Sequence, residues 1–117
     1  MKNSIQLFNV HLNINKNLSV ALTQIFGINL AVSNIICRKF GFNQNSLLKD
    51  VSLSTINEIR KFILLEYSIQ NGLRKNIQAS IADLILMKSI RGLRHKLKLP
   101  VRGQRTRSNH KTQKKII

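Results

Sequence analysis

The spacing of hydrophobic residues predicts two short helices near the start of the chain. Between residues 18 and 25, leucine and isoleucine recur every three or four positions, and Gly27 follows as a helix stop. A second hydrophobic stripe covers residues 31–40 and ends at Gly41. Asn29 suits the N-cap of this stripe, because its side-chain oxygen can accept a hydrogen bond from a first-turn amide. The pattern therefore predicts a helix, a turn and a second helix.

Two longer helices are predicted in the middle of the chain. Ser52 is a suitable N-cap, and the apolar positions after it form a broad stripe that runs to about Tyr67. Asn71 and Gly72 interrupt this pattern, and a fourth stripe then recurs at helical spacing over residues 73–88.

The end of the chain has a different pattern from everything before it. After Lys88, two glycines and Pro100 interrupt the hydrophobic spacing, and the basic residues recur at neither helical nor strand intervals. We therefore predict a helical domain over residues 1–89 and an extended basic RNA-binding arm over residues 90–117.

Charge separates the same two regions. The 117 residues include 20 Lys and Arg against four Asp and Glu, a formal net charge of +16. Lys88–Ile117 holds 11 of the basic residues and none of the acidic ones. So large an excess of one sign normally pairs with a polyanion, and nucleic acid is the leading candidate.

The sequence offers little material for catalysis or metal binding. Cys37 is the only cysteine and three histidines accompany it, which argues against a structural zinc site. Cys37 lies in an apolar run and is expected to be a small buried hydrophobe. No phosphate-cradling glycine loop or nucleophile motif is present, and no apolar stretch approaches the roughly 20 residues that cross a bilayer. We expect no enzymatic activity, no metal, no cofactor and no membrane partner.

Residue types in the arm suit contacts with phosphate. In an extended chain, residues two apart project from one side about 7 Å from each other, close to the separation of neighbouring phosphates, and Arg105 and Arg107 have this spacing. Gly92 and Gly103 suit positions where the backbone needs a positive φ or must approach a phosphate closely. His95 has no carboxylate or nucleophile near it in the sequence, so an RNA-facing imidazole is favoured over a catalytic one. All six aromatic rings precede the arm, so stacking of bases on aromatic side chains is not expected there.

A solvated tail is the alternative interpretation of such a basic run. Leu93, Leu97, Leu99 and Val101 lie among the basic residues, which favours an arm ordered by docking on its own helices or in an RNA groove. The turn at Gly27 suggests a second anion site, because the first-turn amides of the next helix would point outward there. A helix-ending glycine explains the same residue without a ligand.

The most specific motifs lie in the arm. The motif "RGLRH" at Arg91–His95 is followed after three residues by "LPVRGQRTR" and then by Asn109, and this order resembles the small-subunit ribosomal protein S-thirteen family. Weaker agreement is found in "ALTQIFGI" at Ala21–Ile28, in "KDVS" at Lys49–Ser52 and in "LRK" at Leu73–Lys75. The resemblance therefore spans nearly the whole chain.

This resemblance implies an all-α fold with a helix-two-turn-helix N-terminal domain, two longer helices and an extended basic C-terminal arm. It also implies a structural, non-catalytic protein in the head of the small ribosomal subunit, bound to small-subunit rRNA. Members of the family contact ribosomal protein S-nineteen, meet large-subunit protein L-five at an inter-subunit bridge and lie near peptidyl-site tRNA. These partners are therefore expected here.

Matching the family motifs and the basic positions gives a set of candidate RNA-binding residues. They are Gly27, Arg38, Lys39, Arg74, Lys75, Arg91, Gly92, Arg94, His95, Lys96, Arg102, Gly103, Gln104, Arg105, Thr106, Arg107, Asn109 and Lys111. Asn29 stands where the family has its second turn glycine and Leu30 where Arg is usual, which weakens the case for phosphate binding at this turn. Lys98 stands where glycine is usual, which leaves the bend before Pro100 open.

Asn, Ile and Lys are abundant, which indicates an AT-rich gene. Together with the altered turn, this favours a mitochondrially encoded member in the mitochondrial matrix, with bacterial cytoplasm or a plastid as the alternative. Because the match begins near residue 5, no removable presequence is expected. A free-standing basic nucleic-acid-binding module is the alternative function. A DNA-repair glycosylase fragment would share the helix-two-turn-helix topology, but its N-terminal Pro-Glu and four-cysteine zinc finger are missing from this sequence.

Overall fold

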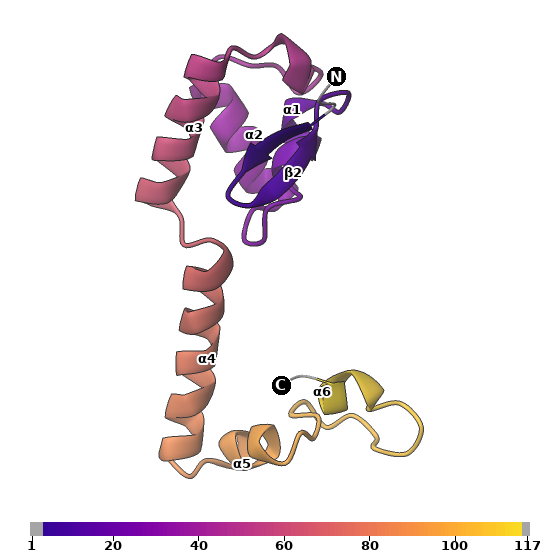
Figure 1. The fold of residues 1–117 in the computed structure, drawn as a ribbon. Coiled ribbons are helices and arrows are strands. Elements are labelled where there is room, and N and C mark those ends of the chain that lie inside the picture. Colours follow the sequence, from indigo (N-terminus) through magenta and orange to yellow (C-terminus); the bar gives the residue numbers. More distant parts are fainter. Residues whose placement is uncertain (1–3, 116–117) are drawn as a thin grey trace. The chain divides into compact units, whose positions relative to one another are not determined.

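The computed structural model describes residues 4–115, and most of its regular structure is helical (Figure 1). The chain divides into two compact units, Met1–Leu73 and Arg74–Ile117. The predicted all-α class is confirmed as a mostly helical fold. One small two-stranded sheet was not predicted.

This sheet is an antiparallel hairpin in the first unit. β1 (Ser4–Leu7) pairs with β2 (Val10–Asn13). Phe8 and Asn9 join the strands with positive φ angles of 50° and 62°, the sign that the commonest two-residue hairpin turns require at both positions. Leu12 is buried in the core beneath the hairpin. Apolar and polar residues alternate here with a period of two, a strand signal that a search for helical spacing misses.

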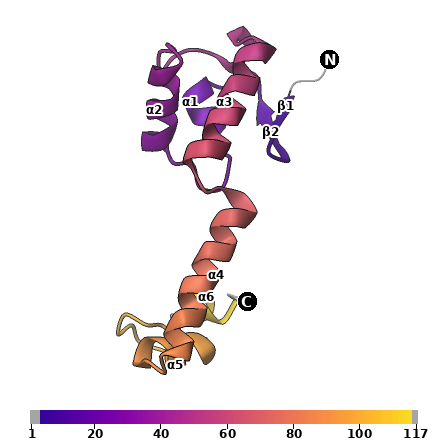
Figure 2. The ribbon, with the colours of Figure 1, turned by 90° about the vertical axis from the view of Figure 1, so that its left-hand side faces the viewer.

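The helical part of the first unit consists of α1 (Leu18–Leu22), α2 (Leu30–Lys39), the 3-10 helix η1 (Leu48–Asp50) and α3 (Leu53–Glu66) (Figure 2). The side-chain oxygen of Asn29 accepts a hydrogen bond from the Val32 amide at 2.9 Å and so caps α2. The hydroxyl oxygen of Ser52 accepts from the Thr55 amide at 3.2 Å and caps α3. The predicted starts of both helices are confirmed.

An aliphatic core holds the first unit together. Its buried members come from the hairpin, the helices and the connecting segments, and they are Leu7, Leu12, Leu18, Ala21, Leu22, Ile25, Ile28, Ile36, Cys37, Leu48, Val51, Ile56, Ile59 and Ile63. Phe62 adds edge-to-face contacts with Phe40 and Tyr67, with ring centroids 5.9 and 6.1 Å apart. Burying each large aliphatic side chain contributes about 1.5–3 kcal/mol, so this core is the main source of stability in the unit.

The boundary between α3 and the next helix differs from the prediction. The predicted break at residues 71–72 is wrong, because α4 (Gln70–Leu86) includes both. The break covers residues 67–69 instead. The Gln70 amide donates a hydrogen bond to the Phe26 carbonyl oxygen at 2.9 Å, so contact with another part of the chain fixes the start of α4. A local sequence signal carries no information about such a contact.

The second unit contains the rest of α4, then α5 (Ile90–Lys96) and α6 (Lys111–Lys115). The prediction of extended chain over residues 90–117 is wrong for α5, where a capped helix forms, and for the short helix α6. Residues 97–110 contain neither helix nor strand, as predicted for the arm. Within residues 74–115 only Gly92 and Pro100 are buried, so this part of the chain has no hydrophobic core.

Candidate RNA-binding surface

A tightly bonded corner joins α4 to α5 (Figure 1). Lys88 has a left-handed φ of 53°, and its amide donates to the Ile85 carbonyl oxygen at 3.0 Å. The Ser89 amide donates to Leu84 at 3.4 Å, which completes a Schellman motif. The Ser89 hydroxyl donates to the same Leu84 carbonyl at 2.9 Å, and its oxygen accepts from the Gly92 amide at 3.0 Å. Ser89 therefore closes one helix and caps the next.

Gly92 is the point where α5 touches the end of α4. A Cβ at this position would overlap the backbone of Leu84 and Ile85. Glycine costs about 1 kcal/mol relative to alanine inside a helix, so the close approach is a sufficient reason for it here. Gly92 was predicted as an RNA contact, and the structure gives it a packing function. Through that function it fixes the direction in which Arg91 and His95 leave the helix.

The C-terminal end of α5 is a second Schellman motif. The Leu99 amide donates to the Arg94 carbonyl oxygen at 2.9 Å and the Lys98 amide donates to His95 at 3.1 Å. Lys98 has a φ of 55°, so lysine adopts the left-handed conformation that glycine would favour, at a cost of about 1–2 kcal/mol. The Arg94 side chain donates from Nε to the Pro100 carbonyl oxygen at 2.5 Å. Arg94 therefore ties the helix to the segment that follows it.

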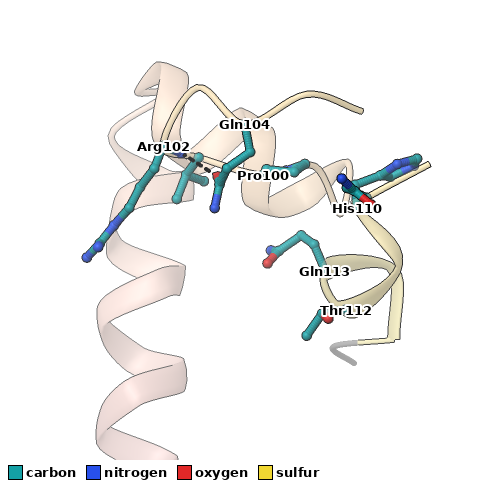
Figure 3. A pocket seen from close by; sticks show the side chains of 8 residues that line it. Pro100, Arg102, Gln104, His110, Thr112 and Gln113 are labelled. Atoms are coloured by element: carbon teal, nitrogen blue, oxygen red, sulfur yellow. Dashed lines mark hydrogen bonds between the residues drawn. The ribbon is translucent and has the colours of Figure 1, made fainter. Parts of the chain in front are cut away.

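The segment after α5 presents exposed polar and basic side chains. Gly103 has a φ of 71° with open space around it, which is the first of the two reasons predicted for a glycine here. The Arg102 amide donates to the Gln104 side-chain oxygen at 3.3 Å and closes a small turn (Figure 3). The guanidinium groups of Arg102, Arg105 and Arg107 are exposed and form no ion pair within residues 4–115. These groups are available to a ligand.

A hollow of about 440 Å³ lies between this segment and α6. Gln104, Asn109, His110 and Gln113 are among the side chains that line it (Figure 3). The Nδ1 atom of His110 is buried and has no hydrogen-bond partner in the described part of the chain. Amide, imidazole and hydroxyl groups of this kind can bond to a sugar or to the edge of a base.

No acidic side chain follows Asp83, so the cations of α5 and the arm have no carboxylate within their own segment. The exposed basic side chains here are Lys88, Arg91, Lys96, Lys98, Arg102, Arg105, Arg107, Lys111, Lys114 and Lys115. Four of them were not among the candidates: Lys88, Lys98, Lys114 and Lys115. Lys88 and Lys98 each follow the end of a helix with a left-handed φ. The sequence could have pointed to them only as places where a helical pattern ends and no glycine follows.

The candidates in the first unit are less available to a ligand. Gly27 has a φ of 108°, and a Cβ there would lie 3.2 Å from the Ser68 carbonyl oxygen, so packing explains this glycine. The Lys39 ammonium lies 3.7 Å from the centroid of the Phe62 ring and forms a cation–π contact. Arg38 is exposed beside an amide-lined hollow of about 360 Å³.

Two further candidates, Arg74 and Lys75, are exposed on α4. Cys37 is buried as expected, and burial is the main cause that raises the pKa of its thiol, while a hydrogen bond with Ser33 lowers it in part. A thiol with a raised pKa is a poor nucleophile at neutral pH. Within residues 4–115, no three His, Cys, Asp or Glu side chains gather as a metal site requires, and no helix has the length and apolar character that a bilayer crossing needs.

Comparison with known proteins gives a consistent result. The model of the family described as ribosomal protein S13/S18 matches residues 6–112. The small ribosomal subunit protein uS13 of Wolbachia sp. subsp. Brugia malayi is 39% identical over 105 residues, which cover 90% of this chain and 86% of that protein. The uS13 protein of Thermodesulfovibrio yellowstonii is 42% identical over 100 residues, with 86% and 83% covered. That of Endomicrobium trichonymphae is 38% identical over 100 residues, with 86% and 77% covered.

Proposed function

Because the chain belongs to the ribosomal protein S13/S18 family, we propose that it is a structural constituent of the small ribosomal subunit that binds rRNA through α5 and the arm. The observation that carries this proposal is the acid-free run of exposed cations over residues 88–115. The corner at Gly92 and the turn at Lys98 give these cations a defined backbone. A family of this kind is structural, and we propose no catalytic role.

The binding chemistry is mainly electrostatic. Each guanidinium group of Arg102, Arg105 and Arg107 can take two phosphate oxygens at once, and each neutralised phosphate releases counterions. Gly103 lets the backbone approach a phosphate because no Cβ intervenes. Arg91 and His95 add exposed or half-exposed donors from α5. The remaining candidates, including Gly27, Arg38, Thr106 and Asn109, are proposed as weaker contacts on the resemblance alone.

The finer placement follows from the family resemblance. We propose that the chain lies in the head of the subunit, next to ribosomal protein S-nineteen, with a bridge to large-subunit protein L-five and with peptidyl-site tRNA nearby. Composition favours a mitochondrial ribosome. The relatives compared above are bacterial, so bacterial cytoplasm stays the alternative location. A density map of the ribosome that contains this chain tests the location in the head and the three neighbours, S-nineteen, L-five and tRNA, together.

Replacing arm arginines tests the rRNA-binding surface itself. Arg102→Ala, Arg105→Ala and Arg107→Ala should each weaken binding to small-subunit rRNA by about 1–3 kcal/mol if the contacts are charge-assisted and desolvated. With about five phosphates neutralised, log K should fall with log salt at a slope of about −3.5 to −4.5. Arg60→Ala is the matched control, because this exposed arginine lies in the first unit, over the Phe8 ring. A salt slope near zero would contradict the proposal.

Order within the arm separates this function from that of a free-standing basic module. A variant with residues 91–107 shuffled keeps the charge and loses the corner, the turn and the Arg spacing. We expect it to bind RNA non-specifically but to fail to assemble into small subunits, measured by sedimentation on a sucrose gradient. Normal assembly of the shuffled chain would favour the free-standing module.

A further inference from the structure

An apolar stripe on α5 faces solvent. Ile90, Leu93 and Leu97 are spaced by three and four residues, so they share one face of the helix. Their side chains are 80%, 56% and 58% exposed. We call these three residues the α5 stripe. In the first unit, stripes with the same spacing supply the core, whereas here more than half of each side chain is exposed.

The chain cannot bury the α5 stripe by rolling the helix. At 100° per residue, Gly92 points well away from the centre of the stripe, and Gly92 is the position packed against Leu84. Arg94 fixes another side of the helix through its bond to the Pro100 carbonyl oxygen. Both contacts hold α5 in the orientation that leaves the stripe outside.

A hollow beside the stripe indicates what kind of partner fits. It measures about 430 Å³ and is lined by Ile85, Leu93, Lys88 and Lys96. Two aliphatic residues and two lysines therefore border the same hollow. A phosphate would pair with the lysines but would leave the aliphatic side chains in contact with water, because a sugar-phosphate backbone offers little apolar surface. An amphipathic protein segment provides both interactions, because its aliphatic side chains cover the stripe and its carboxylates pair with the lysines.

We infer that the α5 stripe docks a segment of another protein in the particle, one that carries aliphatic side chains and carboxylates together. This inference rests on the proposed function, since the ribosomal subunit is where the partner is met. It assigns to α5 two ligands on different faces: rRNA at Arg91 and His95, and protein at the stripe, where Lys88 and Lys96 pair with the partner's carboxylates instead of with phosphate. The charge complement must come from the partner, because the chain has no acid after Asp83.

Leu97→Lys distinguishes a protein partner from RNA, because a protein partner predicts reduced incorporation into small subunits and RNA predicts normal or improved incorporation. The added cation should leave the affinity of the purified chain for small-subunit rRNA unchanged or raise it. If a protein segment covers the stripe, incorporation into small subunits in competition with the wild-type chain should fall about tenfold or more, because the leucine that this segment would bury is replaced by a charged side chain. Leu65→Lys is the matched control, since Leu65 is 85% exposed in the first unit. Normal or improved incorporation of the Leu97 variant would overturn the inference.

Photocrosslinking identifies the occupant directly. A benzophenone amino acid in place of Leu93 is incorporated into assembled small subunits, and the crosslinked product is digested and sequenced. A peptide of another protein with both aliphatic and acidic residues supports the inference. Crosslinks only to rRNA, only within the chain itself, or no more than from the same probe at position 65 overturn it. Failure of the wild-type chain to enter small subunits would instead reject the proposed function.

Discussion

The two units of this protein are stabilised in different ways. Fourteen hydrophobic residues are buried within residues 4–115, and all of them lie between Leu7 and Ile63 in the first unit. By sequence, the first unit has seven basic and three acidic residues, and the second has 13 basic and one acidic. The first unit therefore has a hydrophobic core, and we propose that the second is ordered further by its ligand.

What order the second unit has comes from local backbone devices. A serine cap, two Schellman turns and a glycine contact hold α5, and devices of this kind contribute about 0.5–2 kcal/mol each. They fix the direction of the chain without shielding much apolar surface. A well-defined path of the backbone therefore does not require a hydrophobic core.

The largest expected effect is the contrast between two isoleucines. Ile63 is fully buried in the core, so Ile63→Ala should lower the free energy of unfolding by about 2–5 kcal/mol. Ile90 is 80% exposed, and Ile90→Ala should change it by no more than about 0.5 kcal/mol. Urea unfolding followed by the fluorescence of Tyr67, the only tyrosine, measures both. Equal losses in the two variants would refute the contrast.

A second contrast concerns two helical glycines. Gly92→Ala would force a methyl group into the Leu84 backbone and should cost about 1–3 kcal/mol through overpacking. Gly72→Ala meets nothing closer than the Ser68 hydroxyl oxygen at 3.4 Å and should stabilise α4 by about 0.4–1 kcal/mol. Hydrogen exchange of the Leu93 amide, bonded to the Ser89 carbonyl oxygen, reports on the corner. Unchanged protection in the Gly92 variant would show that the corner tolerates a side chain.

Lys98 lowers the local stability of α5 through its backbone conformation and contributes a charge to the binding surface. Lys98→Gly removes a left-handed lysine, so α5 should gain about 1 kcal/mol of local stability. The same variant loses one cation, so the salt slope of rRNA binding should become shallower by about 0.7–0.9. Hydrogen exchange at the Leu99 amide and a salt titration measure the two effects. A variant that gains stability with an unchanged slope would show that Lys98 does not contact phosphate.

The smallest expected effect is on the pH dependence of the first unit. Burial raises the pKa of Cys37 above its ordinary value of 9.0, so the unfolded chain loses the thiol proton first as pH rises. Stability from this group is complete below pH 9.0 and declines above it, by at most about 1.4 kcal/mol per pH unit. Cys37→Ala should remove this component from the curve of unfolding free energy against pH. Identical slopes in both proteins would show that the thiol is not perturbed.

Local patterns predicted the starts of α2 and α3 but missed α5, although Ser89 caps it in the same way. Asn29 and Ser52 each precede a periodic stripe, and in both cases the side chain caps the helix as expected. The start of α4 was missed because the amide of Gln70 is held by Phe26, which lies over 40 positions earlier in the sequence. No local pattern encodes a bond between such distant positions.

Gly92 shows where the sequence misled. It was placed in an extended arm, with a positive φ or a close approach to phosphate as the two reasons for a glycine, and the extended conformation is wrong because Gly92 lies within α5. Its backbone does approach another group closely, the Leu84 carbonyl oxygen, and contact with RNA at this residue stays a prediction. Ile90, Leu93 and Leu97 carry the helical spacing, which the glycine and the dense positive charge concealed. Gly103 does adopt a positive φ, one of the two reasons predicted for a glycine there, and nothing lies within 4 Å of where its Cβ would be.

The lack of a hydrophobic core in residues 74–115 also affects the expected steady-state amount of this protein in a cell. Segments whose helices are not shielded by tertiary packing open readily, and proteases cut the opened form. We expect newly made copies to be degraded from this end until rRNA covers the arm. The supply of the protein would then follow the supply of its RNA without any dedicated regulator.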